Sequence, residues 1–93
     1  MDIQYSKRAV KAINGMDKPT KNRIRKAMEG IPEGDIKALR GSENSYRLRV
    51  GDWRILFSYF EKESVDEKTG KTVREKAVLI EKAAPRGEVY KRG

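Results

Sequence analysis

Three arginines stand in a short run, YRLRVGDWRIL, whose other members would suit a buried β-strand. Gly51-Asp52 is typical of a two-residue type II′ turn, so the run is predicted to be a β-hairpin. In that register Arg49 faces Arg54, and both share one face of the sheet with Arg47. Like charges placed directly opposite each other destabilise a sheet. Because a planar guanidinium can bind two phosphate oxygens at once, the three arginines indicate an anion site.

The rest of the composition limits the reactions that the chain could catalyse and indicates the class of molecule that it binds. The chain has 93 residues with no cysteine and no histidine, so it lacks a thiol nucleophile, the usual general base and the commonest metal ligand. With 22 Lys and Arg against 14 Asp and Glu, the formal charge is +8, which is typical of a nucleic-acid-binding protein. The alternative to nucleic-acid binding is that this charge serves only to keep the protein soluble. No metal or cofactor is predicted.

The length predicts one domain, spanning residues 1–93. No apolar run has the length of a signal peptide, and none approaches the 18 apolar residues of a membrane span. We therefore expect a soluble, cytoplasmic protein that makes no membrane contact.

The first half of the chain predicts a strand at residues 2–5 and two helices. Ser6 is the expected N-cap of the first helix, which ends near Gly15. Its expected buried stripe consists of Ala9, Val10, Ala12 and Ile13. The second helix is expected from Pro19 to Gly30, with Ile24, Ala27, Met28 and the following Ile31 packed inward. Its opposite face carries Lys21, Arg23, Arg25 and Lys26, which either face solvent or contact a polyanion.

The second half predicts a sheet. Residues 31–41 are expected to form a connecting loop, and the hairpin's second strand is expected at residues 53–60. The charged residues 61–75 form either a long hairpin loop or extended strand ends, and a last strand is expected at residues 76–82. The order β-α-α-β-β-β predicts an α+β fold in which both helices cover one face of a small antiparallel sheet.

This packing would leave the face with Arg47, Arg49 and Arg54 uncovered. Trp53 and Tyr46 are expected on the apolar, helix-covered face. The alternative to an anion site is that the arginines pair with nearby acids. The candidate acids are Glu43, Asp52, Glu81 and Glu88.

Two segments, LRGSENSYRLRVGDWRILFSY and the C-terminal PRGEVYKR, resemble the RelE/ParE superfamily of type II toxin–antitoxin toxins, with the second segment pointing toward RelE. The resemblance covers nearly the whole chain and implies a RelE-like fold. It also implies a ribosome-dependent mRNA endoribonuclease, an mRNA interferase, that inhibits translation from the ribosomal A site. The expected partners are ribosome, mRNA and an antitoxin, which should be acidic to match the +8 charge. A homodimer and a heterotetramer with the antitoxin both stay open.

Position by position, Arg47 and Arg49 match two basic residues of the RelE pattern, and Arg54 matches the arginine after the turn. Tyr90 matches the C-terminal tyrosine, and Arg86 falls near the C-terminal basic residues. The chain departs from the pattern at Ala84, where a RelE-like enzyme carries a catalytic arginine.

The implied reaction is attack of a 2′-hydroxyl on the adjacent phosphorus, which gives a 2′,3′-cyclic phosphate and a free 5′-hydroxyl. Arg54 would stabilise the charge of the phosphorane. Tyr90 is the candidate base, with Glu43 or Glu81 as alternatives, because arginine does not give up a proton. Arg86, or else Lys82, would assist the leaving oxygen.

Two other functions fit the sequence. A ParE-like toxin would inhibit DNA gyrase and cut no RNA, and the alanine at position 84 favours it. The C-terminal element with Arg86 and Tyr90 argues against it, because a gyrase inhibitor would not require that element. A plain basic RNA- or DNA-binding module is the third alternative.

Overall fold

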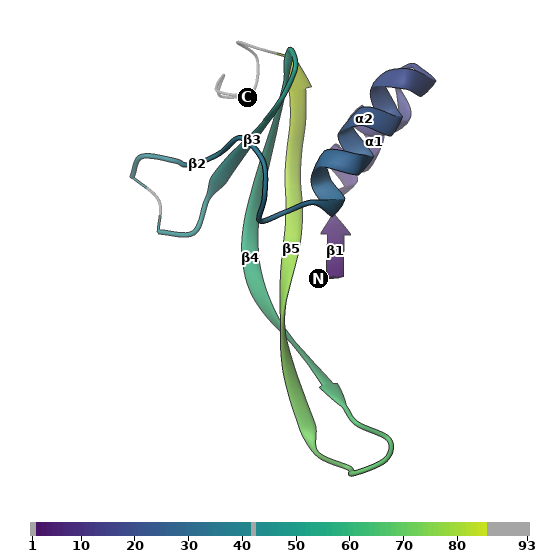
Figure 1. Cartoon of the computed structure of the whole chain (residues 1–93), viewed down its shortest axis with the longest axis vertical. Helices are drawn as coiled ribbons and strands as arrows, with labels where there is room; N and C mark the ends of the chain where they lie inside the picture. Colours follow the sequence, from purple (N-terminus) through teal and green to yellow (C-terminus); the bar gives the residue numbers. More distant parts are fainter. Residues whose placement is uncertain (1, 42, 86–93) are drawn as a thin grey trace.

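The chain folds into a five-stranded sheet with two helices on one side. The computed structural model describes residues 2–41 and 43–85. The strands are β1 (Asp2–Tyr5), β2 (Ile36–Ala38), β3 (Tyr46–Val50), β4 (Trp53–Val65) and β5 (Thr72–Pro85). They lie in the order β1-β5-β4-β3-β2, and only the β1–β5 pair is parallel. The helices are α1 (Lys7–Asn14) and α2 (Lys18–Glu29), which lie on one side of the sheet (Figure 1). The predicted α+β architecture is confirmed.

Both helices begin at a polar capping residue, which was predicted for α1 alone. The Ser6 hydroxyl accepts a hydrogen bond from the Ala9 amide at 3.0 Å, and α1 ends at Gly15. Asp17 caps α2, and Pro19 occupies its first turn, where no intrahelical hydrogen bond is lost. Helix α2 ends at Gly30.

The predicted buried stripe of α1 is only partly present. Ala9 is fully buried and Ile13 is half-buried, but Val10 is 42% exposed, so its predicted burial was wrong. Successive residues of a helix are separated by about 100° of rotation. A short helix that contacts the sheet through Ala9 therefore turns Val10 toward its flank.

The core lies between α2 and the sheet. Its largest fully buried side chains are Phe57, Ile24, Met28, Leu48, Ile55, Ile80 and Val78. Burial of each large apolar side chain contributes roughly 1.5–3 kcal/mol. Trp53 and Tyr46 are half-buried against this core, and Tyr46 stacks on Phe57 with ring centroids 5.6 Å apart. Their predicted place on the apolar face is confirmed.

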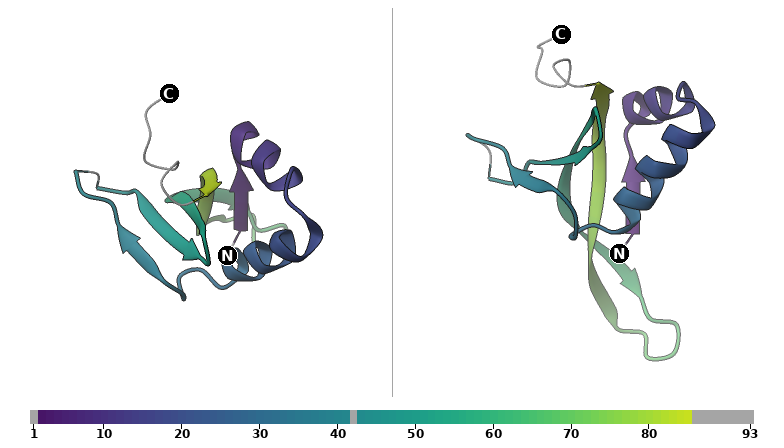
Figure 2. Two further views of the ribbon diagram at one scale, coloured as in Figure 1. Left: turned by 90° about the horizontal axis from the view of Figure 1, so that it is seen from above. Right: turned by 45° about the horizontal axis from the view of Figure 1, so that its top comes forward.

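Strand β2 lies in the segment that was predicted to be a loop. Ile36–Ala38 pairs antiparallel with β3, so that Lys37 is opposite Arg47. The loop prediction was wrong for these three residues. The strand is too short to show a clear sequence pattern, and it forms because it pairs with β3. Figure 2 shows β2 at the edge of the sheet, away from the helices.

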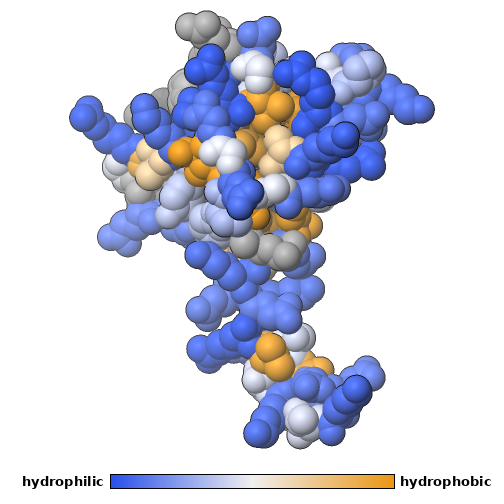
Figure 3. Space-filling model, in the orientation of Figure 1, coloured by the Kyte–Doolittle hydropathy of each residue, from blue (hydrophilic) through white to orange (hydrophobic). Residues whose placement is uncertain are grey.

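The ends of β4 and β5 extend beyond the rest of the sheet as a two-stranded arm, here defined as residues 61–76 (Figure 1). Pairing continues to Val65 and Thr72, so of the two alternatives for this segment the extended strand ends are present. The arm carries five basic and five acidic residues, and its net charge is zero. The whole charge of +8 therefore belongs to the rest of the chain. Figure 3 shows the arm as mostly hydrophilic, with a small apolar patch toward its end.

Neither of the two helices in the described ranges is long and apolar enough to span a membrane.

Candidate nucleic-acid interface

The β3–β4 hairpin has the predicted register. Arg49 is opposite Arg54, and Val50 is opposite Trp53. Gly51 has a φ of 58°, whereas no non-glycine residue in the described ranges has a positive φ. A positive φ at the first central position alone is typical of a type II′ turn.

Two neighbouring rows of side chains form the sheet face that is turned away from Leu48 and Ile55. One row runs across four strands through Lys37, Arg47, Leu56 and Lys82. The next row contains Arg49, Arg54 and Ala84. We call the five cations of these rows, Lys37, Arg47, Arg49, Arg54 and Lys82, the basic sheet face. The sheet thus brings together the three predicted arginines and two lysines that are distant from them in sequence.

Arg47 is held at the edge of this face by an acid that was not predicted as its partner. Its Nη2 lies 3.5 Å from Asp35 Oδ1, and only 13% of its side chain is exposed. Its Nε atom is buried and has no hydrogen-bond partner in the described structure. A buried donor without a partner costs free energy. The Asp35 contact therefore leaves part of the hydrogen-bonding capacity of Arg47 unused.

Arg54 is buried rather than fully open on the face, with 6% exposure. Its Nη1 donates hydrogen bonds to the Gly51 carbonyl at 2.9 Å and to the Trp53 carbonyl at 3.0 Å. These bonds fix the guanidinium against the turn. A fixed cation loses little conformational freedom when it binds an anion.

Arg49 is exposed, and no ion pair joins it to an acid in residues 2–41 and 43–85. The acids proposed as alternatives to an anion, Glu43, Asp52 and Glu81, form no ion pair with the three arginines in these ranges. Glu88 lies outside the described residues. Within the described ranges one of the three arginines, Arg47, thus pairs with an acid, and that acid is Asp35.

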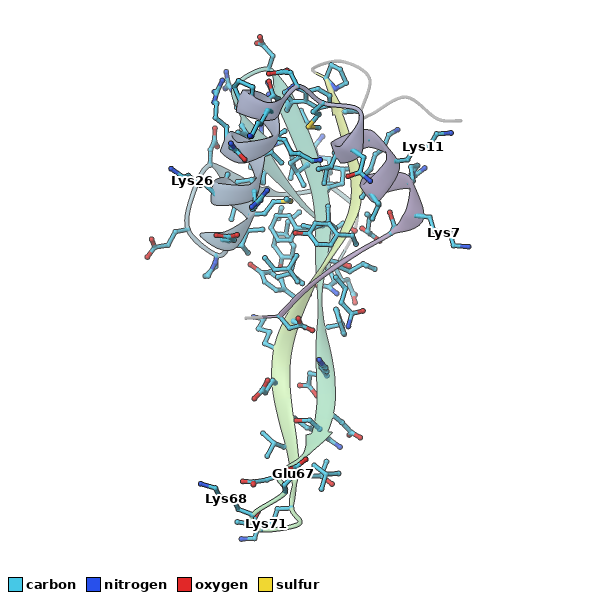
Figure 4. The ribbon with its side chains drawn as sticks, turned by 90° about the vertical axis from the view of Figure 1, so that its right-hand side faces the viewer. Lys7, Lys11, Lys26, Glu67, Lys68 and Lys71 are labelled. Carbon is cyan, nitrogen blue, oxygen red and sulfur yellow. The ribbon has the colours of Figure 1, made fainter. Side chains whose placement is uncertain are left out.

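The four cations predicted on one face of α2 do not share one surface. Lys21 and Arg25 line a cavity between the helices. Arg23 reaches the hairpin, because a Cβ atom on Gly51 would lie 2.8 Å from its Nη2. Figure 4 shows Lys26 pointing away from α1. Contact of all four residues with RNA stays a prediction.

Sequence reasoning missed Lys37 because its strand was predicted to be a loop. The alternation of Ile36, Lys37 and Ala38 was the available signal, and it spans only three residues. Ala84 is buried and lies opposite Arg54, so the position where the family pattern has an arginine belongs to this site. Arg86 and Tyr90 lie outside the described residues.

Residues 2–41 and 43–85 contain no group of three or more metal-ligating side chains that could hold a metal ion. The five cations of the basic sheet face supply fixed positive charge, which can bind an anionic backbone and stabilise additional negative charge on phosphate.

No protein-family model matches the chain, and no curated protein sequence matches it. Among solved structures, the chain is similar to one in the RelB–RelE antitoxin–toxin complex from Methanococcus jannaschii, with a TM-score of 0.63 and 22% sequence identity. The similarity covers 94% of each chain. The arrangement of two N-terminal helices and a mostly antiparallel sheet is therefore the RelE-like α+β fold.

Proposed function

We propose that this protein is the toxin of a type II toxin–antitoxin system and that it cleaves mRNA on the ribosome. The observation that carries the proposal is the basic sheet face, which gathers five cations from four strands of a RelE-like sheet. The solved RelB–RelE complex supports it, because a protein of this fold is a toxin held by an antitoxin. The expected partner is an acidic antitoxin, since the chain carries a charge of +8.

The proposed reaction needs a base, charge stabilisation and an acid. Tyr90 would take the proton of the 2′-hydroxyl, whose oxygen attacks the adjacent phosphorus. Arg54 would stabilise the charge that develops on the non-bridging oxygens, because the turn carbonyls already hold its guanidinium in place. Arg86 or Lys82 would assist the departing 5′-oxygen. Arg47 and Arg49 would bind flanking phosphates.

Controlled expression in bacteria tests this proposal. Induction should arrest growth, and primer-extension mapping should reveal new 5′ ends within translated mRNA shortly afterwards. Arg49→Glu should abolish both effects, because it reverses an exposed charge on the basic sheet face. Lys68→Glu is the matched control, since Lys68 lies at the end of the net-neutral arm (Figure 4). Normal growth at high levels of folded protein would contradict the toxin assignment.

One observation supports inhibition of DNA gyrase as a second candidate. Ala84 occupies the position where the RelE pattern has a catalytic arginine, next to Arg54. Supercoiling by purified gyrase distinguishes the two candidates. Inhibition of supercoiling, together with intact transcripts in arrested cells, would favour the gyrase inhibitor.

A further inference from the structure

A second candidate binding site lies on the helix side of the molecule. The cavity between the two helices and β1 has a volume of about 180 Å³. Its apolar lining comes from Tyr5, Val10, Ile13 and Met28, and two cations, Lys21 and Arg25, stand beside them. The basic sheet face looks in the opposite direction, because the helices cover the other face of the sheet. The two sites therefore lie on opposite faces of the sheet.

The exposed apolar residues point to this cavity. Among the described residues, the large hydrophobic side chains that remain exposed are Tyr5, Val10, Val65 and Val73. The two valines on the arm lie at its far end, whereas Tyr5 and Val10, at 41% and 42% exposure, both line the cavity. These two partly exposed side chains therefore belong to one concave site, where a partner could cover both.

The two charged groups that line the cavity favour carboxylates, and the lining also contains the neutral side chain of Asn14. Lys21 and Arg25 are four residues apart on α2, so they lie on the same side of the helix. Burial, followed by the charge of Glu29, raises the pKa of the Tyr5 hydroxyl, while Arg25 acts in the opposite direction. The phenol therefore stays protonated at neutral pH and is able to donate a hydrogen bond.

We propose that this cavity is the docking site for an acidic amphipathic segment of a partner protein. One apolar side chain of the segment enters the cavity, and carboxylates next to it pair with Lys21 and Arg25. The inference rests on the proposed function, in which that partner is the acidic antitoxin.

The size and lining of the cavity fit such an anchor. A cavity of about 150 Å³ lined by apolar side chains can hold a benzene molecule, so this one accepts a leucine or phenylalanine side chain. An RNA backbone has no comparable apolar group. The lining therefore favours a peptide over a nucleic acid at this site.

A pair of synthetic peptides tests the proposal with the full-length protein. The first is a helical peptide with leucines on one face and glutamates beside them, and the second has lysines in place of the glutamates. Fluorescence anisotropy should detect binding of the acidic peptide only. Methyl NMR spectra should show its largest shift changes at Val10, Ile13 and Met28.

Two pairs of variants locate the binding. Val10→Lys should weaken binding of the acidic peptide at least about tenfold, because it removes an apolar wall of the cavity. Val65→Lys changes an exposed valine of the arm in the same way and should have no effect. The double variant Lys21→Glu/Arg25→Glu should abolish binding. Lys7→Glu is its control, since Lys7 points away from α2 (Figure 4).

Three results would overturn the proposal: no binding of the acidic peptide at millimolar concentration, equal binding of the basic peptide, or methyl shifts that an RNA oligonucleotide reproduces. The last result would make the cavity part of the RNA surface. A separate measurement, RNA binding by the variants, tests the proposed function independently of the docking site. Val10→Lys should bind RNA like the unaltered protein, whereas RNA binding that survives Arg49→Ala unchanged would contradict the basic sheet face and leave the docking site intact.

Discussion

Arg49 and Arg54 lie directly opposite each other on β3 and β4, but only Arg54 is buried. The Gly51 and Trp53 carbonyls accept hydrogen bonds from Arg54 Nη1, and their partial negative charge offsets the repulsion between the two arginines. Arg49 remains exposed. The hairpin thus combines a fixed guanidinium with an accessible one, and the proposed reaction assigns charge stabilisation to the first and phosphate binding to the second.

Arg54→Lys should lower single-turnover cleavage by about 10²–10³-fold and leave RNA binding nearly unchanged. Lysine keeps the charge, but it cannot form the two bonds of the planar group in the same position, and loss of one preorganised donor typically has an effect of this size. Rates should be measured on ribosomes that translate a defined mRNA.

Arg54→Ala is a harsher test of the same residue. It also removes the hydrogen bonds to the turn, which contribute about 1.5–3 kcal/mol when the donor is charged. Thermal unfolding must therefore accompany its kinetics. A stable Arg54→Lys variant that cleaves at the original rate would assign Arg54 to the turn alone.

Asp35→Asn should strengthen RNA binding, because it removes the carboxylate that pairs with Arg47 at 3.5 Å. Arg47→Ala and Arg49→Ala should each reduce the salt dependence of binding by about 0.7–0.9 in the slope of log affinity against log salt. Titrations at several salt concentrations measure both effects. RNA affinity that does not change with salt would rule out the polyanion site.

Ala84→Arg should raise the cleavage rate and lower the free energy of unfolding. The new guanidinium would stand opposite Arg54, where the RelE pattern has a catalytic arginine, but it would replace a buried methyl group by a charge. Cleavage and thermal unfolding of this variant should be compared with those of Ala84→Met, which adds volume without charge. Equal activity of the two variants would show that charge at this position does not aid the reaction.

Tyr90→Phe should reduce single-turnover cleavage by about 10²–10⁴-fold, as expected for loss of a general base. Only the hydroxyl is removed, so ribosome binding should not change. If this variant cleaves at the original rate, the base must be sought at Glu43, Glu81 or in the ribosome and RNA.

The N-cap of α2 should make stability depend on pH. Thr20 donates to Asp17 through its hydroxyl at 2.7 Å and its amide at 3.2 Å, and these bonds lower the pKa of Asp17 below its ordinary value of 3.8. A lowered pKa in the folded state stabilises the fold above the ordinary value, and the contribution disappears as the pH falls through the folded pKa. Asp17→Asn should therefore be less stable than the unaltered protein at pH 7 but equally stable in strong acid. Urea unfolding at both pH values measures this, and a difference that does not change with pH would contradict it.

The sequence alone was sufficient to predict the local structure of this protein. The caps at Ser6 and Gly15, the Gly51 turn and the pairing of Arg49 with Arg54 all depend on residues that are near one another in the chain. Periods of two and 3.6 residues distinguish strands from helices over such distances. For the same reason the order of all elements except β2, and with it the α+β fold, could be predicted.

Tertiary packing decided what each site residue contacts. The pairing of β2 with β3 brings Lys37 beside Arg47, and the β4–β5 ladder brings Lys82 and Ala84 into the same rows. The burial of Arg54 and the exposure of Val10 likewise depend on the relative positions of whole elements. These contacts join residues far apart in the chain, and a pattern within one segment carries no information about the distance to another, so only the folded structure determines them.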